Sequence, residues 1–113
     1  MSAAAPPLRV AFALSPLVDE APVRRLRVPV PELVVPDGTR PDVLAMARRG
    51  WEDRARAEYI GVMVVRHFHG LLVDVGAPMD VQEAALAMLL QEQQHAGLCA
   101  EAARALGSDG EIQ

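Results

Sequence analysis

Prolines divide this chain into an N-terminal segment that cannot form a long helix and a C-terminal part that can. Seven of the nine prolines lie in the first 40 residues, where they favour extended or polyproline-like backbone. We therefore expect residues 1–40 to form an irregular arm. Residues 23–35 mix arginines with apolar side chains, so two interpretations stay open: a mobile leader, or a strap that binds a partner subunit or a shell protein.

Beyond the arm, turn and capping signals predict a first long helix. Asp37-Gly38 is a turn signal, and Thr39-Arg40-Pro41-Asp42 has the pattern of a capping box with proline in the first turn. The first helix is therefore expected from about residue 41 to about residue 75. Gly76-Ala77-Pro78 then ends it, because proline cannot continue a helix and glycine tolerates the backbone of a tight turn.

A second helix is expected from about residue 81 to about residue 106. Asp80, followed by Glu83, supplies its N-cap signal, and Gly107 is a natural C-terminal cap. Two long helices with a short connection form an antiparallel hairpin, so we expect an all-α fold. The chain then divides into an arm over residues 1–40, a helical hairpin over residues 41–107 and a flexible tail over residues 108–113.

Each expected helix carries one apolar stripe, which alternating steps of four and three residues follow. The polar members are Glu58 and His69 in the first helix and Glu92 and His95 in the second. His69 is three turns from Glu58, roughly 16 Å, and is expected to be a core or interface histidine. The two stripes consist of Trp51, Ala55, Glu58, Val62, Val65, His69 and Leu72, and of Val81, Ala85, Met88, Glu92, His95, Cys99, Ala102 and Leu106.

The buried acids call for a positive partner. An ionised carboxylate buried without a partner costs several kcal/mol, and two facing carboxylates also repel each other. A bound divalent or trivalent cation removes both penalties. Carboxylate and imidazole are the ligand set expected for iron or manganese, and zinc is also compatible with them.

The positions around Gly76 predict which side chains meet. Glu58 precedes Gly76 by 18 residues, and Glu92 and His95 follow it by 16 and 19. Equal separations mean equal height in an antiparallel hairpin, to within about one helical turn, and residues three apart share a helix face. Glu58, Glu92 and His95 are therefore predicted to bind metal together. Gly61, one turn beyond Glu58, would leave room for a neighbouring helix or a ligand.

The same residues also have a metal-free explanation. In it, Glu92 and His95 form a buried charged pair and Glu58 faces solvent. Two neighbours of the site are expected to be structural in either case. Tyr59 is expected to be a buried tyrosine with a satisfied hydroxyl rather than a redox partner, and Cys99 a small buried hydrophobe rather than a thiol ligand.

Glu58, Gly76-Ala77-Pro78, Glu92-Gln93-Gln94-His95-Ala96 and Leu98-Cys99 together resemble one half of a ferritin-like di-iron domain, over about residues 41–106. That superfamily builds its site in a four-helix bundle, in which one helix of each pair gives a Glu and the other gives Glu-x-x-His. The resemblance implies that Glu58 is a terminal carboxylate ligand. It also implies that Glu92 bridges two metals and that His95 is a terminal imidazole ligand.

A full ferritin-like chain has two such hairpins, and this chain has one. A two-fold homodimer would restore four glutamates and two histidines around two metals. The layout is similar to that of encapsulated ferritins, short two-helix chains whose sites form between subunits within a protein shell. Residues 108–113 do not resemble the shell-docking peptide of that family. Another interpretation is a truncated copy, or one half, of a longer ferritin-like protein.

The resemblance implies an oxidoreductase, either a ferroxidase that oxidises Fe(II) with oxygen or peroxide or a related di-iron enzyme that reduces peroxide or oxidises another substrate. The metal would be a pair of iron ions, with manganese or zinc as substitutes, held within a homodimer or a higher homo-oligomer. Mineral storage would require a larger assembly than a dimer. The competing class is a metal-free helical dimerisation or interaction module, derived from half of a ferritin-like protein.

Composition indicates which partners and which cellular compartment we expect for the protein. The formal net charge of −4 argues against nucleic acid as a partner. The single cysteine, Cys99, excludes an intrachain disulfide and fits a reducing compartment. No apolar run approaches the roughly 20 residues that span a membrane. We therefore expect a cytoplasmic protein without a signal peptide, with the inside of a protein nanocompartment as a further location.

Overall fold

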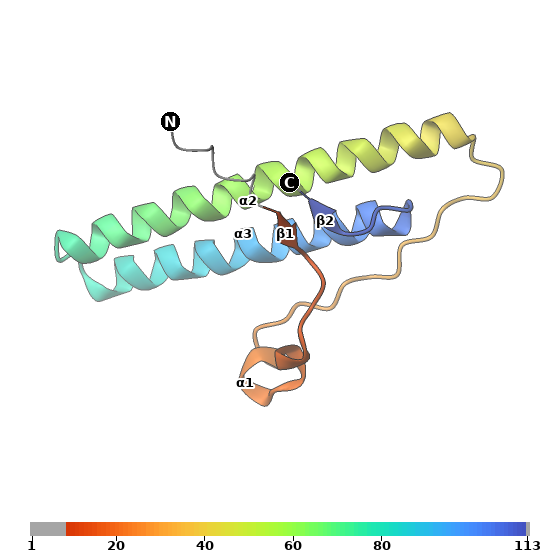
Figure 1. Ribbon diagram of the computed structural model, residues 1–113. Coiled ribbons are helices and arrows are strands. Elements are labelled where there is room, and N and C mark those ends of the chain that lie inside the picture. Colours follow the sequence, from red (N-terminus) through yellow and green to blue (C-terminus); the bar gives the residue numbers. More distant parts are fainter. Residues whose placement is uncertain (1–8, 113) are drawn as a thin grey trace, which may run out of the picture.

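Two long antiparallel helices form the body of the protein (Figure 1). The computed structural model describes residues 9–112. Helix α2 spans Pro41–Asp74 and helix α3 spans Met79–Ala105, and the two pack along their length. The predicted all-α hairpin is confirmed at this level, with helix ends within two residues of those expected.

Both helices end at a glycine with left-handed backbone, as the sequence indicated. Gly76 has φ +67° and Gly107 has φ +102°. After α2, the Ala77 amide donates to the Leu72 carbonyl at 2.9 Å, and after α3 the Ser108 amide donates to the Ala103 carbonyl at 3.1 Å. These are the Schellman bonds that satisfy the last carbonyls of a helix. Glycine, which lacks a Cβ atom, adopts the left-handed backbone that they require without strain.

The predicted N-caps are wrong in detail. The residue before α2 is Arg40, and the Thr39 hydroxyl donates back to the Pro36 carbonyl at 2.6 Å instead of accepting from the helix. Helix α3 begins at Met79, so Asp80 lies inside its first turn and accepts from the Val81 amide at 3.0 Å. Neither helix has a side-chain cap bond, so the start of each depends on the turn that precedes it.

The described part of the arm is irregular, as expected, but it packs against the hairpin. It contains strand β1 (Val10–Ala11), the 3₁₀ helix η1 (Pro16–Asp19) and the four-residue helix α1 (Ala21–Arg24). Farther along, the Gln94 side chain on α3 donates to the Leu26 carbonyl at 2.5 Å. Figure 1 shows the arm running beside α3 before it reaches the start of α2.

The C-terminal segment differs from the flexible tail that we expected. Glu111–Ile112 form strand β2, which pairs antiparallel with β1, so that Val10 lies opposite Ile112. The Ile112 side chain is only 3% exposed and belongs to a core cluster with Ala55, Cys99 and Ala100. The two ends of the described chain therefore meet over the middle of the hairpin.

The interface between the helices is made of small side chains. The residues of α3 that are buried are Ala85, Ala96, Cys99, Ala100, Ala102 and Ala103. Many large apolar side chains of both helices stay exposed, among them Val64, Phe68 and Met88. None of the helices between residues 9 and 112 is both long enough and apolar enough to cross a membrane.

Candidate metal centre

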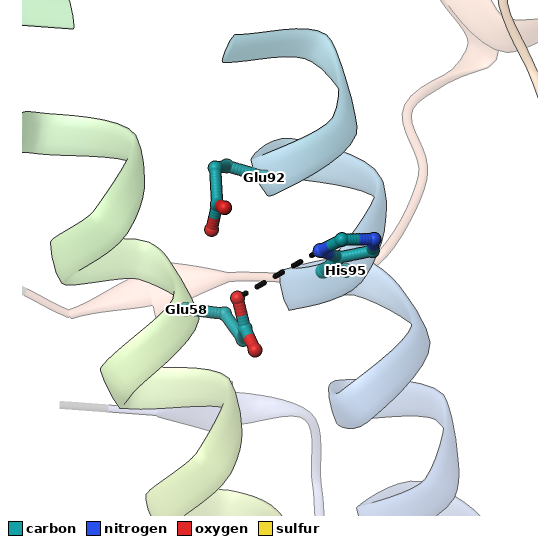
Figure 2. Close-up of side chains that lie close together, drawn as sticks. All are labelled: Glu58, Glu92 and His95. Atoms are coloured by element: carbon teal, nitrogen blue, oxygen red, sulfur yellow. Dashed lines mark ion pairs between the residues drawn. The ribbon is translucent and has the colours of Figure 1, made fainter. Parts of the chain in front are cut away.

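The hairpin brings Glu58, Glu92 and His95 together, as the spacing around Gly76 predicted. Glu58 comes from α2, and Glu92 and His95 come from successive turns of α3. One ligand atom from each residue lies within 4.8 Å of the other two. Figure 2 shows Glu58 and Glu92 in the space between the helices and His95 beside α3, with one ring nitrogen towards Glu58. Two carboxylates and an imidazole in this arrangement form a three-residue donor set that could hold a cation.

Glu58 does not face solvent, so the metal-free arrangement that we considered is not the one found. Its side chain is 16% exposed, and one oxygen, Oε2, lies 3.9 Å from His95 Nδ1. The other oxygen, Oε1, accepts from Arg54 Nε at 3.1 Å. The His95 side chain is 55% exposed, so it is not part of a buried charged pair either.

Glu92 carries the electrostatic signature of two carboxylates placed side by side. Hydrogen bonding with the Glu58 carboxylate is the largest cause that raises the pKa of Glu92. Burial and the negative charge of Glu58 raise this pKa further, whereas His95 acts in the opposite direction. Two carboxylates this close favour sharing a positive charge, which is either a proton or a metal cation.

A missing side chain on α2 makes room for Glu92. A Cβ atom built on Gly61 would lie 2.7 Å from Glu92 Oε2, closer than such atoms approach in practice, and 3.3 Å from its Cδ. The sequence predicted that Gly61 leaves room for a neighbouring helix or a ligand, and the structure shows the occupant to be this carboxylate. Gly50 and Gly70 of the same helix have no atom within 4 Å of the equivalent position.

The other candidate residues lie away from the donor set or are structural. The Tyr59 ring packs edge-to-face on Phe12, with centroids 6.3 Å apart, which places it against β1 rather than at the site. Cys99 is buried in the core cluster. Burial, followed by the charge of Glu58, raises the pKa of this thiol, so it stays protonated. Cys99 is thus the small buried residue that the sequence favoured, whereas Tyr59 is half-buried rather than buried.

Two neighbours of the site were not predicted from the sequence. Arg54 stands four residues before Glu58, the usual spacing for an ion pair on a helix, and this signal was available. The second neighbour is the arm. A cavity of about 360 Å³ lies between the arm and α3, and it is lined by residues 27–31 and by the side chains of Gln94, His95 and Leu98. No local sequence pattern predicts this contact, because the two segments are far apart in the sequence.

No family model matches this chain, and searches of curated proteins and of solved structures find no match.

The donor set leaves a cation incompletely enclosed. One hairpin offers three ligand residues, all from the same side, and His95 is open to the surroundings. Iron and manganese bind carboxylate oxygen and imidazole nitrogen together, and their usual coordination needs more donors than three monodentate groups. The remaining positions are available to water, to oxygen or to side chains of another copy.

Proposed function

We propose that this chain forms a homodimeric, ferritin-like four-helix bundle that binds a pair of iron ions and oxidises Fe(II). The observation that carries the proposal is the meeting of Glu58, Glu92 and His95 within 4.8 Å across the hairpin. A two-fold axis beside this half-site would add a second identical set. The resulting four glutamates and two histidines are the ligand complement of the di-iron carboxylate bundles.

Exposed apolar surface supports the dimer. The hairpin is a small folding unit, and such units seldom bury enough apolar surface alone. Its interface is built mainly from alanines, while large side chains such as Val64, Phe68 and Met88 remain exposed. A second hairpin packed on these residues would bury them and bring the two half-sites together.

The proposed chemistry uses the charge of the carboxylates. Two Fe(II) ions each give one electron to one molecule of oxygen, which takes up two protons and leaves as hydrogen peroxide. Four nearby carboxylates stabilise the additional positive charge of the two Fe(III) products relative to the Fe(II) substrates. Glu58, Glu92 and His95 of each copy would hold the iron, with the two Glu92 carboxylates shared between the ions. Manganese or zinc would fit the same donors.

Metal analysis with a matched pair of variants tests this function. We expect wild-type protein loaded with Fe(II) to hold two ions per dimer and to consume oxygen. Glu92→Ala should lose the iron and the oxygen consumption but remain a helical dimer. Glu83→Ala removes an exposed carboxylate from the same helix and should match the wild type. Equal iron content in the Glu92→Ala variant and the wild type would refute the site assignment.

One observation favours a second candidate, a metal-free helical interaction module. The ion pair between Arg54 and Glu58 provides a positive partner for the half-buried Glu58 carboxylate without a metal ion. In this alternative the hairpin dimerises or docks through the same surfaces and needs no iron. A dimer that takes up no iron after anaerobic Fe(II) loading would select this alternative over the oxidase.

A further inference from the structure

We infer that the second copy packs antiparallel to the first, and that Phe68 of each copy enters a pocket that the arm of the other copy helps to build. The inference rests on the dimer of the proposed function and specifies its geometry. It also assigns a role to the arm, which the sequence left open between a leader and a strap.

The hairpin has one covered side and one open side. Tyr59 packs on Phe12, and both line a cavity with Ile112, so β1 and β2 cover this side of α2 (Figure 1). Phe68 lies nine residues after Tyr59, or two and a half helical turns, and therefore on the opposite side of α2. A second hairpin is thus free to approach the site only from the side that carries Phe68.

On the open side, exposed apolar side chains lie on the same face of the hairpin as the metal-binding residues. Phe68 and Met88 lie seven residues, or two turns, from Gly61 and His95 respectively, both in the direction of the Gly76 turn. Residues seven apart share a helix face, so these two side chains lie on the same face of the hairpin as the half-site, two turns nearer to Gly76. Phe68 is 45% exposed, so this aromatic ring is available for contact with another molecule.

A pocket lies on the same face at the other end of the hairpin. Arm residues 33–36 form one wall, and Ala47 and Trp51 of α2 with Ala102 and Leu106 of α3 form the others. Its volume is about 290 Å³ and its lining is almost wholly apolar. A cavity of about 150 Å³ holds a benzene molecule, so this pocket has room for a phenylalanine ring.

Phe68 and the pocket lie at equal distances from the half-site. Phe68 is 10 residues from Glu58 towards the turn, roughly 15 Å, and Ala47 is 11 residues from Glu58 in the other direction, roughly 16 Å. A two-fold axis through the site and perpendicular to the helices exchanges these two directions. It therefore brings Phe68 of each copy to the pocket of the other, to within one helical turn.

The alternative two-fold axis, parallel to the helices, lacks this complementarity. It would place the two Phe68 rings at one end of the dimer and the two arm pockets together at the other end. Apolar cavities facing one another would stay empty, and empty cavities forfeit packing. The fit of an exposed ring to an apolar pocket therefore selects the antiparallel dimer, and residues 33–36 of the arm become part of its interface.

The first test measures dimer dissociation by analytical ultracentrifugation for two serine variants. Phe68→Ser should weaken the dimer at least tenfold, because central aromatic residues dominate interface energetics. Val73→Ser is the matched control, since Val73 has a similar exposure of 48% but lies about 140° around the helix from Phe68. Equal dissociation constants for Phe68→Ser and the wild type would overturn the inference.

The second test reads the direction of the two copies by cross-linking. Chains carrying Phe68→Cys and tagged chains carrying Ala47→Cys are mixed and mildly oxidised, with Cys99 present in both as a common background. We expect a disulfide between the two kinds of chain. A disulfide between two Phe68→Cys chains would show the parallel axis and overturn the inference.

The outcomes separate this inference from the function on which it rests. A dimer that binds two irons but forms no cross-link between positions 68 and 47 overturns the docking geometry alone. A wild-type chain that stays monomeric when loaded with iron removes the dimer, and the proposed function falls with it.

Discussion

Gly61 is the residue through which α2 accommodates the carboxylate of α3. A Cβ atom at this position would meet Glu92 Oε2 at 2.7 Å, so any side chain here displaces Glu92 or separates the helices. Glycine inside a helix costs about 1 kcal/mol relative to alanine. The chain thus has a residue that weakens its longest helix at the place where the proposed metal-binding carboxylate needs space.

We predict that Gly61→Ala lowers iron affinity by about tenfold or more, because a displaced ligand loses its orientation. Gly50→Ala and Gly70→Ala make the same change in the same helix without a nearby atom, and should bind iron as the wild type does. Thermal unfolding should show the two controls stabilised by about 1 kcal/mol each. Unchanged iron affinity in Gly61→Ala would show that Glu92 is not a ligand.

The second prediction at this scale follows from the raised pKa of Glu92. The folded protein holds this proton more tightly than the unfolded chain does, mainly through the hydrogen bond with Glu58. This contribution to stability therefore grows as pH falls from above the raised pKa towards the ordinary pKa of glutamate. At higher pH the ionised Glu92 carboxylate is destabilised by the negative charge of Glu58.

The comparison is with Glu92→Gln, which keeps the shape of the side chain and cannot ionise. Urea unfolding of the metal-free proteins at several pH values should show the variant more stable than the wild type near neutral pH. The difference should shrink as the solution is acidified to the ordinary glutamate pKa. A difference that does not vary with pH would contradict the assignment of the shared proton to this pair.

At the level of elements, the pairing of β1 with β2 connects the arm to the hairpin. Ile112 of β2 lies in the core cluster with Ala55 of α2 and Ala100 of α3, and Phe12 packs against that cluster. A two-residue strand contributes little through its hydrogen bonds alone. The buried isoleucine is therefore the main energetic link between the C-terminal segment and the helices.

We predict that Ile112→Ala lowers the free energy of unfolding by about 2 kcal/mol or more, the usual cost of a large-to-small change in a core. Glu111→Ala is the control, because Glu111 is exposed and its ion pair with Arg9, at 3.4 Å, lies at the surface. Urea unfolding measures both. Similar small losses in the two variants would mean that the tail does not stabilise the hairpin.

At the level of the whole molecule, the proposed iron site couples folding to metal and to dimer formation. A ligand that binds only the folded protein stabilises it by about 2.7 kcal/mol at one hundred times its dissociation constant. We predict a stability gain of this order when Fe(II) is added anaerobically. Thermal unfolding with and without Fe(II) measures the gain, and Glu92→Ala should show none. A similar gain in that variant would place the metal elsewhere.

Local patterns were sufficient to predict the two helices, the turn at Gly76 and the meeting of Glu58, Glu92 and His95. The reason is that helical rise is regular, so counting residues from a turn gives height and face. Gly61 was recognised as open space for the same reason, although its occupant was not.

Contacts between distant segments were decided only by the folded chain. The pairing of Val10 with Ile112 joins residues at opposite ends of the chain, and two-residue strands leave no periodic pattern in the sequence. The same holds for the contact of Gln94 with Leu26 and for the pocket that arm residues 33–36 complete. These contacts depend on how the arm closes around the hairpin, and that closure determines which side of the half-site stays open to another molecule.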